Sequence, residues 1–285
     1  MHTYNERNAL TQQFNKLCRI LKENIYRCRY WPDFENIHNL RVSVKKIRSA
    51  QQLIKKYIDE NAETSAAWLF YMNTLFKYGG KVRELQINST IANKLSIPYL
   101  EEYQSTCNAQ IMIDTENFHY MLENFDSLLF NAYNLKVNSQ IQHIDFTNLN
   151  LFFEDFTQDK LNNIKFLIKH QSTSNLHKIR LEIKVLIENL DFIASMDEQE
   201  YLTAFLKKLR RLYQKIGNWH DLQVFKTSLK AFYKSNLLNE EHIHTAIEDI
   251  NLSLKHLQKD IYALLKKNLK LSTKNKLMLQ LNELV

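Results

Sequence analysis

An all-α fold is the architecture that this sequence of 285 residues predicts. The chain has only three glycines and two prolines, whereas strand-rich folds draw on these residues for their many turns. Apolar residues recur at helical spacing along most of the chain, as in the stripe of Leu10, Phe14 and Leu17. With 45% apolar and 24% charged residues, the composition is that of a globular protein.

The apolar stripes and the two prolines predict eight helices in two sets of four. Pro32 and Pro98 suit the first turn of a helix, where no backbone N–H is needed, so each is expected to open one. A polar loop at Val137–Asp145 is the predicted divide between a first half, about 4–135, and a second half, about 146–270. The tail from Leu271 receives no assignment. The expected helices cover about 4–29, 32–57, 62–90, 98–131, 147–170, 174–194, 198–231 and 239–269.

The two halves carry a common pair of motifs. HNLRVSVKKIR (His38–Arg48) and GKVRELQI (Gly80–Ile87) are matched by HKIRLEIK (His177–Lys184) and GNWHDLQV (Gly217–Val224). The first motif repeats after 139 residues and the second after 137. Gly80 and Gly217 therefore correspond, each inside a predicted helix, where glycine costs about 1 kcal/mol relative to alanine. Close approach of a neighbouring helix, or of a ligand, is expected at both.

Positive side chains form a row, here called the first row, on one face of the helix predicted at 32–57. It consists of His38, Arg41, Lys45 and Arg48, and Gln52, Lys55 and Lys56 extend the same face. No Asp or Glu occurs between Asn36 and Tyr57, whereas solvated helix faces usually mix both signs. A bound anion would relieve the repulsion, and an ordinary solvated face is the alternative.

The second half carries a shorter copy, the second row, made of His177, Arg180 and Lys184. Ile187 and Asp191 stand where the first row has Arg48 and Gln52. Two further positive rows lie at Lys207, Arg211 and Lys215 and at Lys255, Lys259, Lys266 and Lys270. The last of these is expected to be solvated surface.

The formal net charge of +7 favours an anionic partner but does not choose among nucleic acid, membrane headgroups and phosphate polymers. Three sparse cysteines, Cys18, Cys28 and Cys107, predict buried free thiols in a reducing compartment. The polar N-terminus and the lack of a long apolar run predict neither a secretory signal nor a membrane span.

Together the motifs resemble the CHAD family, the conserved-histidine α-helical domains. The family pattern is a His followed by Arg at +3 and by Lys or Arg at +7, +8 and +10, which HNLRVSVKKIR matches. VRELQI and WHDLQV resemble the family's leucine-flanked Arg-Asp or His-Asp pair, although Glu84 replaces the usual Asp. The resemblance covers about residues 5–270.

The resemblance implies one domain over 1–285, built of two pseudo-symmetric four-helix bundles with a central basic channel. That channel would bind inorganic polyphosphate without catalysis, in a cytoplasmic protein associated with polyphosphate granules, and no cofactor is expected. The candidate polyphosphate-binding residues are His38, Arg41, Lys45, Arg48, Lys55, Arg83, His177, Arg180, Lys184, Lys207, Arg211 and His220.

Polyphosphate has no bases to recognise, so its binding must rest on charge-assisted hydrogen bonds. Like-charge crowding is expected to hold the pKa of the histidines down until phosphate binds. Affinity should therefore strengthen as the pH falls below about 7 and weaken with added salt.

Three other functions compete with polyphosphate binding. A nucleic-acid-binding protein would add stacking aromatic residues, but most of these, including Phe70 and Phe76, lie on apolar stripes and are expected in the core. An enzyme using His220 and Asp221 is disfavoured, because adjacent helical residues point about 100° apart. His242 and His244 lack a third ligand, so no metal site is expected. A helical scaffold for a protein partner stays open.

Overall fold

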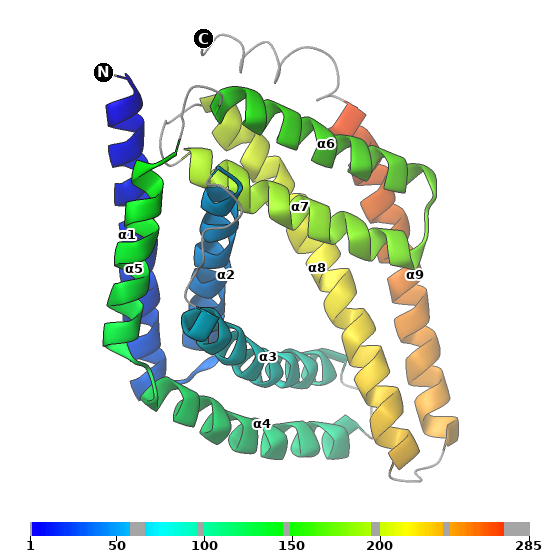
Figure 1. The fold of residues 1–285 in the computed structure, drawn as a ribbon. Coiled ribbons are helices and arrows are strands. Elements are labelled where there is room, and N and C mark those ends of the chain that lie inside the picture. Colours follow the sequence, from blue (N-terminus) through cyan, green and yellow to red (C-terminus); the bar gives the residue numbers. More distant parts are fainter. Residues whose placement is uncertain are drawn as a thin grey trace. The chain divides into compact units, whose positions relative to one another are not determined.

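The computed structural model describes residues 2–57, 66–95, 100–144, 149–194, 200–235 and 240–270 (Figure 1). In this part of the chain there are nine helices and no strand, which confirms the all-α prediction. The helices are α1 (His2–Tyr30), α2 (Phe34–Tyr57), α3 (Ala66–Leu95), α4 (Leu100–Glu123), α5 (Ser127–Gln142), α6 (Leu149–Lys169), α7 (Thr173–Ala194), α8 (Glu200–Ser235) and α9 (Glu240–Lys270). Pro98 and the tail from Leu271 onward both lie outside the described residues.

The chain divides into two compact units, unit 1 (Met1–Asp145) and unit 2 (Phe146–Val285). In unit 1, α3 packs along α4, and α1 packs against both α2 and α5 (Figure 1). In unit 2, α8 packs between α7 and α9, and α6 packs against α7. None of the described helices combines the length and apolar character that crossing a bilayer requires.

The apolar stripes predicted from the sequence form the cores of both units. On α2, Leu40, Val44 and Ile47 are buried, as is Ile54, while Ile58 lies outside the described residues. The largest buried side chains are aromatic: Trp68 of unit 1 contacts the rings of Phe130 and Tyr133, and unit 2 buries Trp219 and Phe225. All three cysteines are buried free thiols, and burial raises the pKa of Cys18 and Cys28 to about 12.

Two predicted boundaries in unit 1 are wrong. The helix expected over about 98–131 is two helices, because Asp126 caps α5 by accepting hydrogen bonds from the backbone N–H groups of Leu128 (2.8 Å) and Leu129 (3.0 Å). The apolar spacing runs on across this break and conceals it. The loop expected at Val137–Asp145 is mostly the end of α5. Its polar residues lie on the outer face of a helix whose inner face buries Val137 and Ile141.

The start of α2 shows that the internal repeat extends beyond the two motifs. Pro32 precedes the helix rather than opening it, because Asp33 is the cap and accepts a hydrogen bond from the backbone N–H of Asn36 (2.7 Å). The side chain of Asn36 donates to the carbonyl of Trp31. In unit 2, 139 residues later, Asn175 makes the same two bonds to Ser172 and His170.

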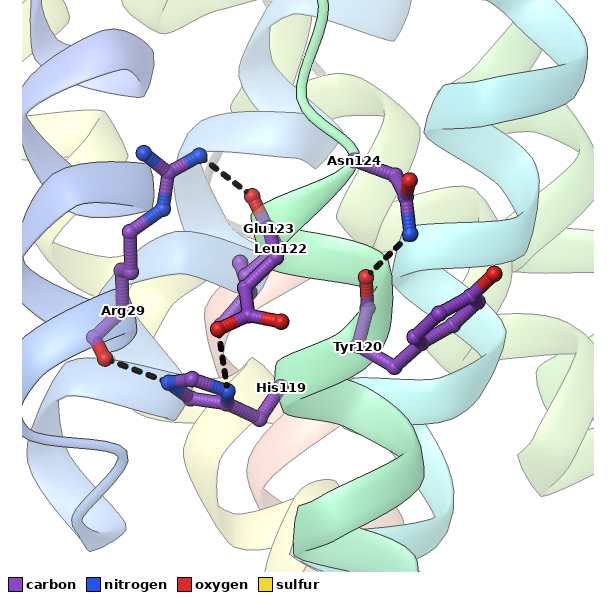
Figure 2. Close-up of polar contacts among 6 residues, drawn as sticks. All are labelled: Arg29, His119, Tyr120, Leu122, Glu123 and Asn124. Carbon is purple, nitrogen blue, oxygen red and sulfur yellow. Dashed lines mark hydrogen bonds and ion pairs between the residues drawn. The ribbon is translucent and has the colours of Figure 1, made fainter.

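A polar cluster joins the C-terminal ends of α1 and α4 (Figure 2). Arg29 donates from Nη2 to the carbonyl of Leu122 (2.6 Å), and Nε2 of His119 donates to the carbonyl of Arg29 (2.7 Å). Nδ1 of His119 faces the carboxylate of Glu123 at 3.5 Å. The last carbonyls of a helix have no partner within it, and His119 supplies one to Arg29. The carbonyl of Leu122 accepts from Arg29 and also from the backbone N–H of Phe125 (3.2 Å).

Candidate anion-binding site

In unit 1, three cations of the first row gather over a single aromatic ring. The ring centroid of Phe76 on α3 lies 4.1 Å from Cζ of Arg41, 5.8 Å from Nζ of Lys45 and 5.6 Å from Cζ of Arg48. Arg41 also donates from Nη1 to the carbonyl of Phe76 (2.6 Å). The negative face of an aromatic ring attracts cations, so Phe76 partly offsets the repulsion among these three side chains.

A second stacked pair adds positive charge beside this group. Cζ of Arg83, on α3, lies 3.2 Å from the ring centroid of Phe34, the first residue of α2. Burial and then the positive charge of Arg83 lower the pKa of Arg41 to about 10. The carboxylate of Glu84 opposes this shift. The structure therefore brings Arg83 close to the first row.

The pKa of His38 reports the charge that surrounds it. Burial lowers this pKa most, and the positive charges of Arg83, Lys45 and Arg41 lower it further, against a smaller opposing effect of Glu35. Like-charge crowding thus acts as expected from the sequence, but burial is the larger cause. The surroundings of His38 therefore favour its neutral form.

Gly80 is explained by the site itself. A Cβ atom built on Gly80 would lie 2.5 Å from Nη1 of Arg41, closer than real Cβ atoms approach a neighbour. The neighbour that fills this space is therefore the side chain of Arg41, held on Phe76 by its hydrogen bond and by the ring.

Unit 2 repeats the cation-on-aromatic pair. Cζ of Arg180 lies 5.0 Å from the ring centroid of Tyr213, and these residues correspond to Arg41 and Phe76 in the register of the repeat. The ring centroids of His177 and His220 lie 5.2 Å apart. Burial, followed by the charges of Arg180 and His177, lowers the pKa of His220 to about 4.

Carboxylates accompany the positive side chains of unit 2. Lys184 of the second row lies 3.7 Å from the carboxylate of Glu188, one turn further along α7. Asp191, which replaces the polar Gln52 of the first row, forms an ion pair with Arg210 of α8. The second row is therefore partly neutralised by its own unit.

The remaining predicted residues lie apart from these groups. Lys55 is exposed two turns beyond Arg48 on α2, and Lys207 and Arg211 are exposed on α8. The structure does not bring these three side chains to the rings of Phe76 or Tyr213. In the described part of the chain no three His, Cys, Asp or Glu side chains could hold a metal ion together. The side chain of His242 lies outside that part, and His244 faces Glu248.

The sequence pattern of the CHAD domain family matches residues 9–230. This chain belongs to the CHAD family. The crystal structure of the CHAD domain from the plant Ricinus communis has a TM-score of 0.74, covering 93% of this chain and 91% of that chain. At 17% sequence identity, this likeness shows that the CHAD fold is shared. A comparison with curated proteins finds no match.

The aromatic members of the candidate site were not predicted from the sequence, which placed Phe76 in the core. Their signal is spacing: Phe76 and Tyr213 each lie four residues before a motif glycine, and Phe34 lies four residues before His38. Residues four apart share a helix face, so each ring had to lie on the face of the motif. Phe70, also expected in the core, is 73% exposed.

Proposed function

We propose that this CHAD domain binds inorganic polyphosphate through the first row and does not convert it chemically. One observation carries the proposal: Arg41, Lys45 and Arg48 converge on Phe76, and beside them burial and the positive charges of Arg83, Lys45 and Arg41 lower the pKa of His38. A cluster of this kind is costly in the free protein, and a phosphate chain would relieve it.

The side chains suit a ligand that carries charge and no bases. Arginine offers a planar fork that can bond two phosphate oxygens, and lysine supplies a mobile charge. Phosphate bound beside His38 would raise the pKa of that ring and let it donate a further hydrogen bond. Affinity is thus expected to increase as the pH falls, and to decrease steeply with salt. The channel between the two halves implied by the family resemblance stays a prediction.

Titration of the purified protein with long-chain polyphosphate tests the proposal. Replacing Arg41, Lys45 and Arg48 together with glutamine should weaken binding by about 100-fold or more, because each lost charge-assisted bond is worth roughly 1–2 kcal/mol. Equal affinity in the variant and the native protein would remove the first row as the site.

A matched control distinguishes the loss of the first row from a general loss of positive charge. Lys16, Arg27 and Lys136 are exposed cations of unit 1 outside the first row, and their joint replacement by glutamine also removes three charges. This variant should lose less than about threefold in affinity. If both variants weaken alike, attraction is diffuse and no defined site exists.

Two further measurements address turnover and location. Polyphosphate incubated with the protein should keep its chain length, and shortening would contradict binding without catalysis. In cells that store polyphosphate, a tagged protein should gather at the granules, whereas the first-row variant should spread evenly.

Single-stranded nucleic acid is the second candidate, favoured by one observation. Tyr30 and Trp31, just before α2, are 68% and 67% exposed, and exposed rings beside cations can stack with bases. Competition between polyphosphate and an oligonucleotide of equal charge separates the two functions. Preferential displacement by the oligonucleotide, lost in a Trp31→Ala variant, would favour nucleic acid.

A further inference from the structure

Unit 2 contains a pocket of about 640 Å³, here called the α8–α9 pocket, where α8 and α9 meet the start of α7. Three lysines line it: Lys226 from α8, and Lys255 and Lys259 from α9. Side-chain amides contribute most of the remaining polar groups, at Gln171, Gln223, Asn251 and Gln258. The lining contains a histidine, His256, but no aspartate or glutamate.

The positive charge of the pocket has no acidic counterpart. Within the described residues, no ion pair involves any of the three lysines. Lys226 donates to Oδ1 of Asn251 (3.2 Å), a neutral acceptor that orients the ammonium group without cancelling its charge. Burial and the nearby charge of Lys230 lower the pKa of Lys226, as expected where positive charge is uncompensated.

The equivalent positions of unit 1 lack this chemistry. In the register of the repeat, Lys226 corresponds to Ser89, which donates to Oδ1 of Asn108 (3.0 Å) in place of the lysine bond to Asn251. Thr173, which lines the pocket, corresponds to the large ring of Phe34. The same helix positions thus hold a neutral hydrogen bond between Ser89 and Asn108 in unit 1. In unit 2 they hold Lys226, with the small residue Thr173 also lining the pocket.

We propose that the α8–α9 pocket binds a compact organic phosphate, with two phosphate groups on a small hydroxyl-bearing scaffold, as in a sugar bisphosphate. Three ammonium groups match the charge of two phosphates, and the amides can donate to and accept from hydroxyl groups. The volume lies in the range of small-molecule sites. None of the lining residues belongs to the first or second row, so the proposal does not rest on polyphosphate binding.

Calorimetric titration with fructose 1,6-bisphosphate as the probe tests the assignment. Lys226→Ser, which installs the residue of unit 1, combined with Lys255→Gln and Lys259→Gln should weaken binding by at least about tenfold. Fructose should not bind, and inorganic phosphate should bind at least about tenfold more weakly than the bisphosphate. If inorganic phosphate binds as tightly as the bisphosphate, the pocket is not built for an organic scaffold and the proposal fails.

The control variant replaces Lys208, Lys234 and Lys267 with glutamine, which removes the same charge from exposed positions of α8 and α9 outside the pocket. Its affinity for the bisphosphate should stay within about twofold of the native value. An equal loss in both variants would overturn the proposal, because the effect would then be one of net charge. Unchanged circular dichroism and thermal midpoints establish that both variants fold.

Lysine acetylation provides an independent readout on the native protein. The bisphosphate should slow the acetylation of Lys226, Lys255 and Lys259 at least about threefold, while Lys208 and Lys234 react at their former rates. Uniform rates with and without the probe would place the ligand elsewhere. Long-chain polyphosphate binding is measured in parallel. If the first-row variant loses polyphosphate binding but still binds the bisphosphate, and the pocket variant does the reverse, the two sites are separate.

Discussion

Arg41 lies over Phe76 in unit 1, and Arg180 lies over Tyr213 at the equivalent positions of unit 2. The two pairs differ in what surrounds them. Unit 1 adds Lys45 and Arg48 over the same ring, whereas unit 2 has Glu188 beside its row lysine. The difference teaches that the cation-on-aromatic pair belongs to the helix packing of the fold, while the crowding of further cations over the same ring is a separate property of unit 1.

The two motif glycines also differ in how closely the arginine packs against them. Gly80 leaves room for the guanidinium of Arg41, but a Cβ atom on Gly217 would meet nothing within 4 Å. Arg180 lies further from its ring than Arg41 does, 5.0 Å against 4.1 Å, and does not approach the glycine. Packing of the arginine against the motif glycine is thus found at Gly80 and not at Gly217.

The largest expected contrast is in polyphosphate affinity. Arg41→Gln should weaken binding about tenfold or more, because it removes one charge from the cluster over Phe76. Arg180→Gln should cost less than about threefold, since the second row is already partly neutralised. Titrations of both variants at one salt concentration decide the matter, and equal losses would show that the two units contribute alike.

The sequence predicted the helices and the first row because both are local. Apolar spacing identifies α2, and the spacing from His38 to Arg48 places the cations on one face. It did not predict the break at Asp126, because the apolar spacing continues across it. Nor did it predict that Phe76 lies beneath three cations, since an aromatic residue on an apolar stripe looks like core until the neighbouring helix is in place. Ion pairs between helices, such as Asp191 with Arg210, are likewise invisible before the fold is known.

Alanine at the two motif glycines should change stability in opposite directions. Gly80→Ala gains helix propensity but forces Arg41 off the carbonyl of Phe76, for a net loss of about 1 kcal/mol. Gly217→Ala meets open space and should raise the free energy of unfolding by up to about 1 kcal/mol. Urea unfolding of both variants measures this. A destabilised Gly217→Ala would show that this glycine serves something other than packing.

The titration of His220 predicts a pH dependence of stability for unit 2. The unfolded chain takes up this proton near pH 6.5, but the folded chain does so only near pH 4, so stability should fall as the pH drops through that window. His220 is partly exposed, so solvent screening limits the effect to the order of 1 kcal/mol. The fall in urea midpoint between pH 7.5 and 4.5 should be smaller in His220→Asn. At the equivalent position unit 1 has Arg83, which keeps its charge throughout.

The smallest expected effect would make unit 2 more like unit 1. Glu188→Gln removes the carboxylate that lies 3.7 Å from Lys184, and so strengthens the field of the second row without adding a cation. A partly exposed pair of this kind is worth roughly 0.5 kcal/mol, so polyphosphate affinity should rise about two- to threefold. The gain should vanish in Lys184→Gln, because the carboxylate then has no lysine to neutralise. A gain that survives in the double variant would mean that Glu188 repels the ligand directly, and that the second row takes part through its field rather than through Lys184.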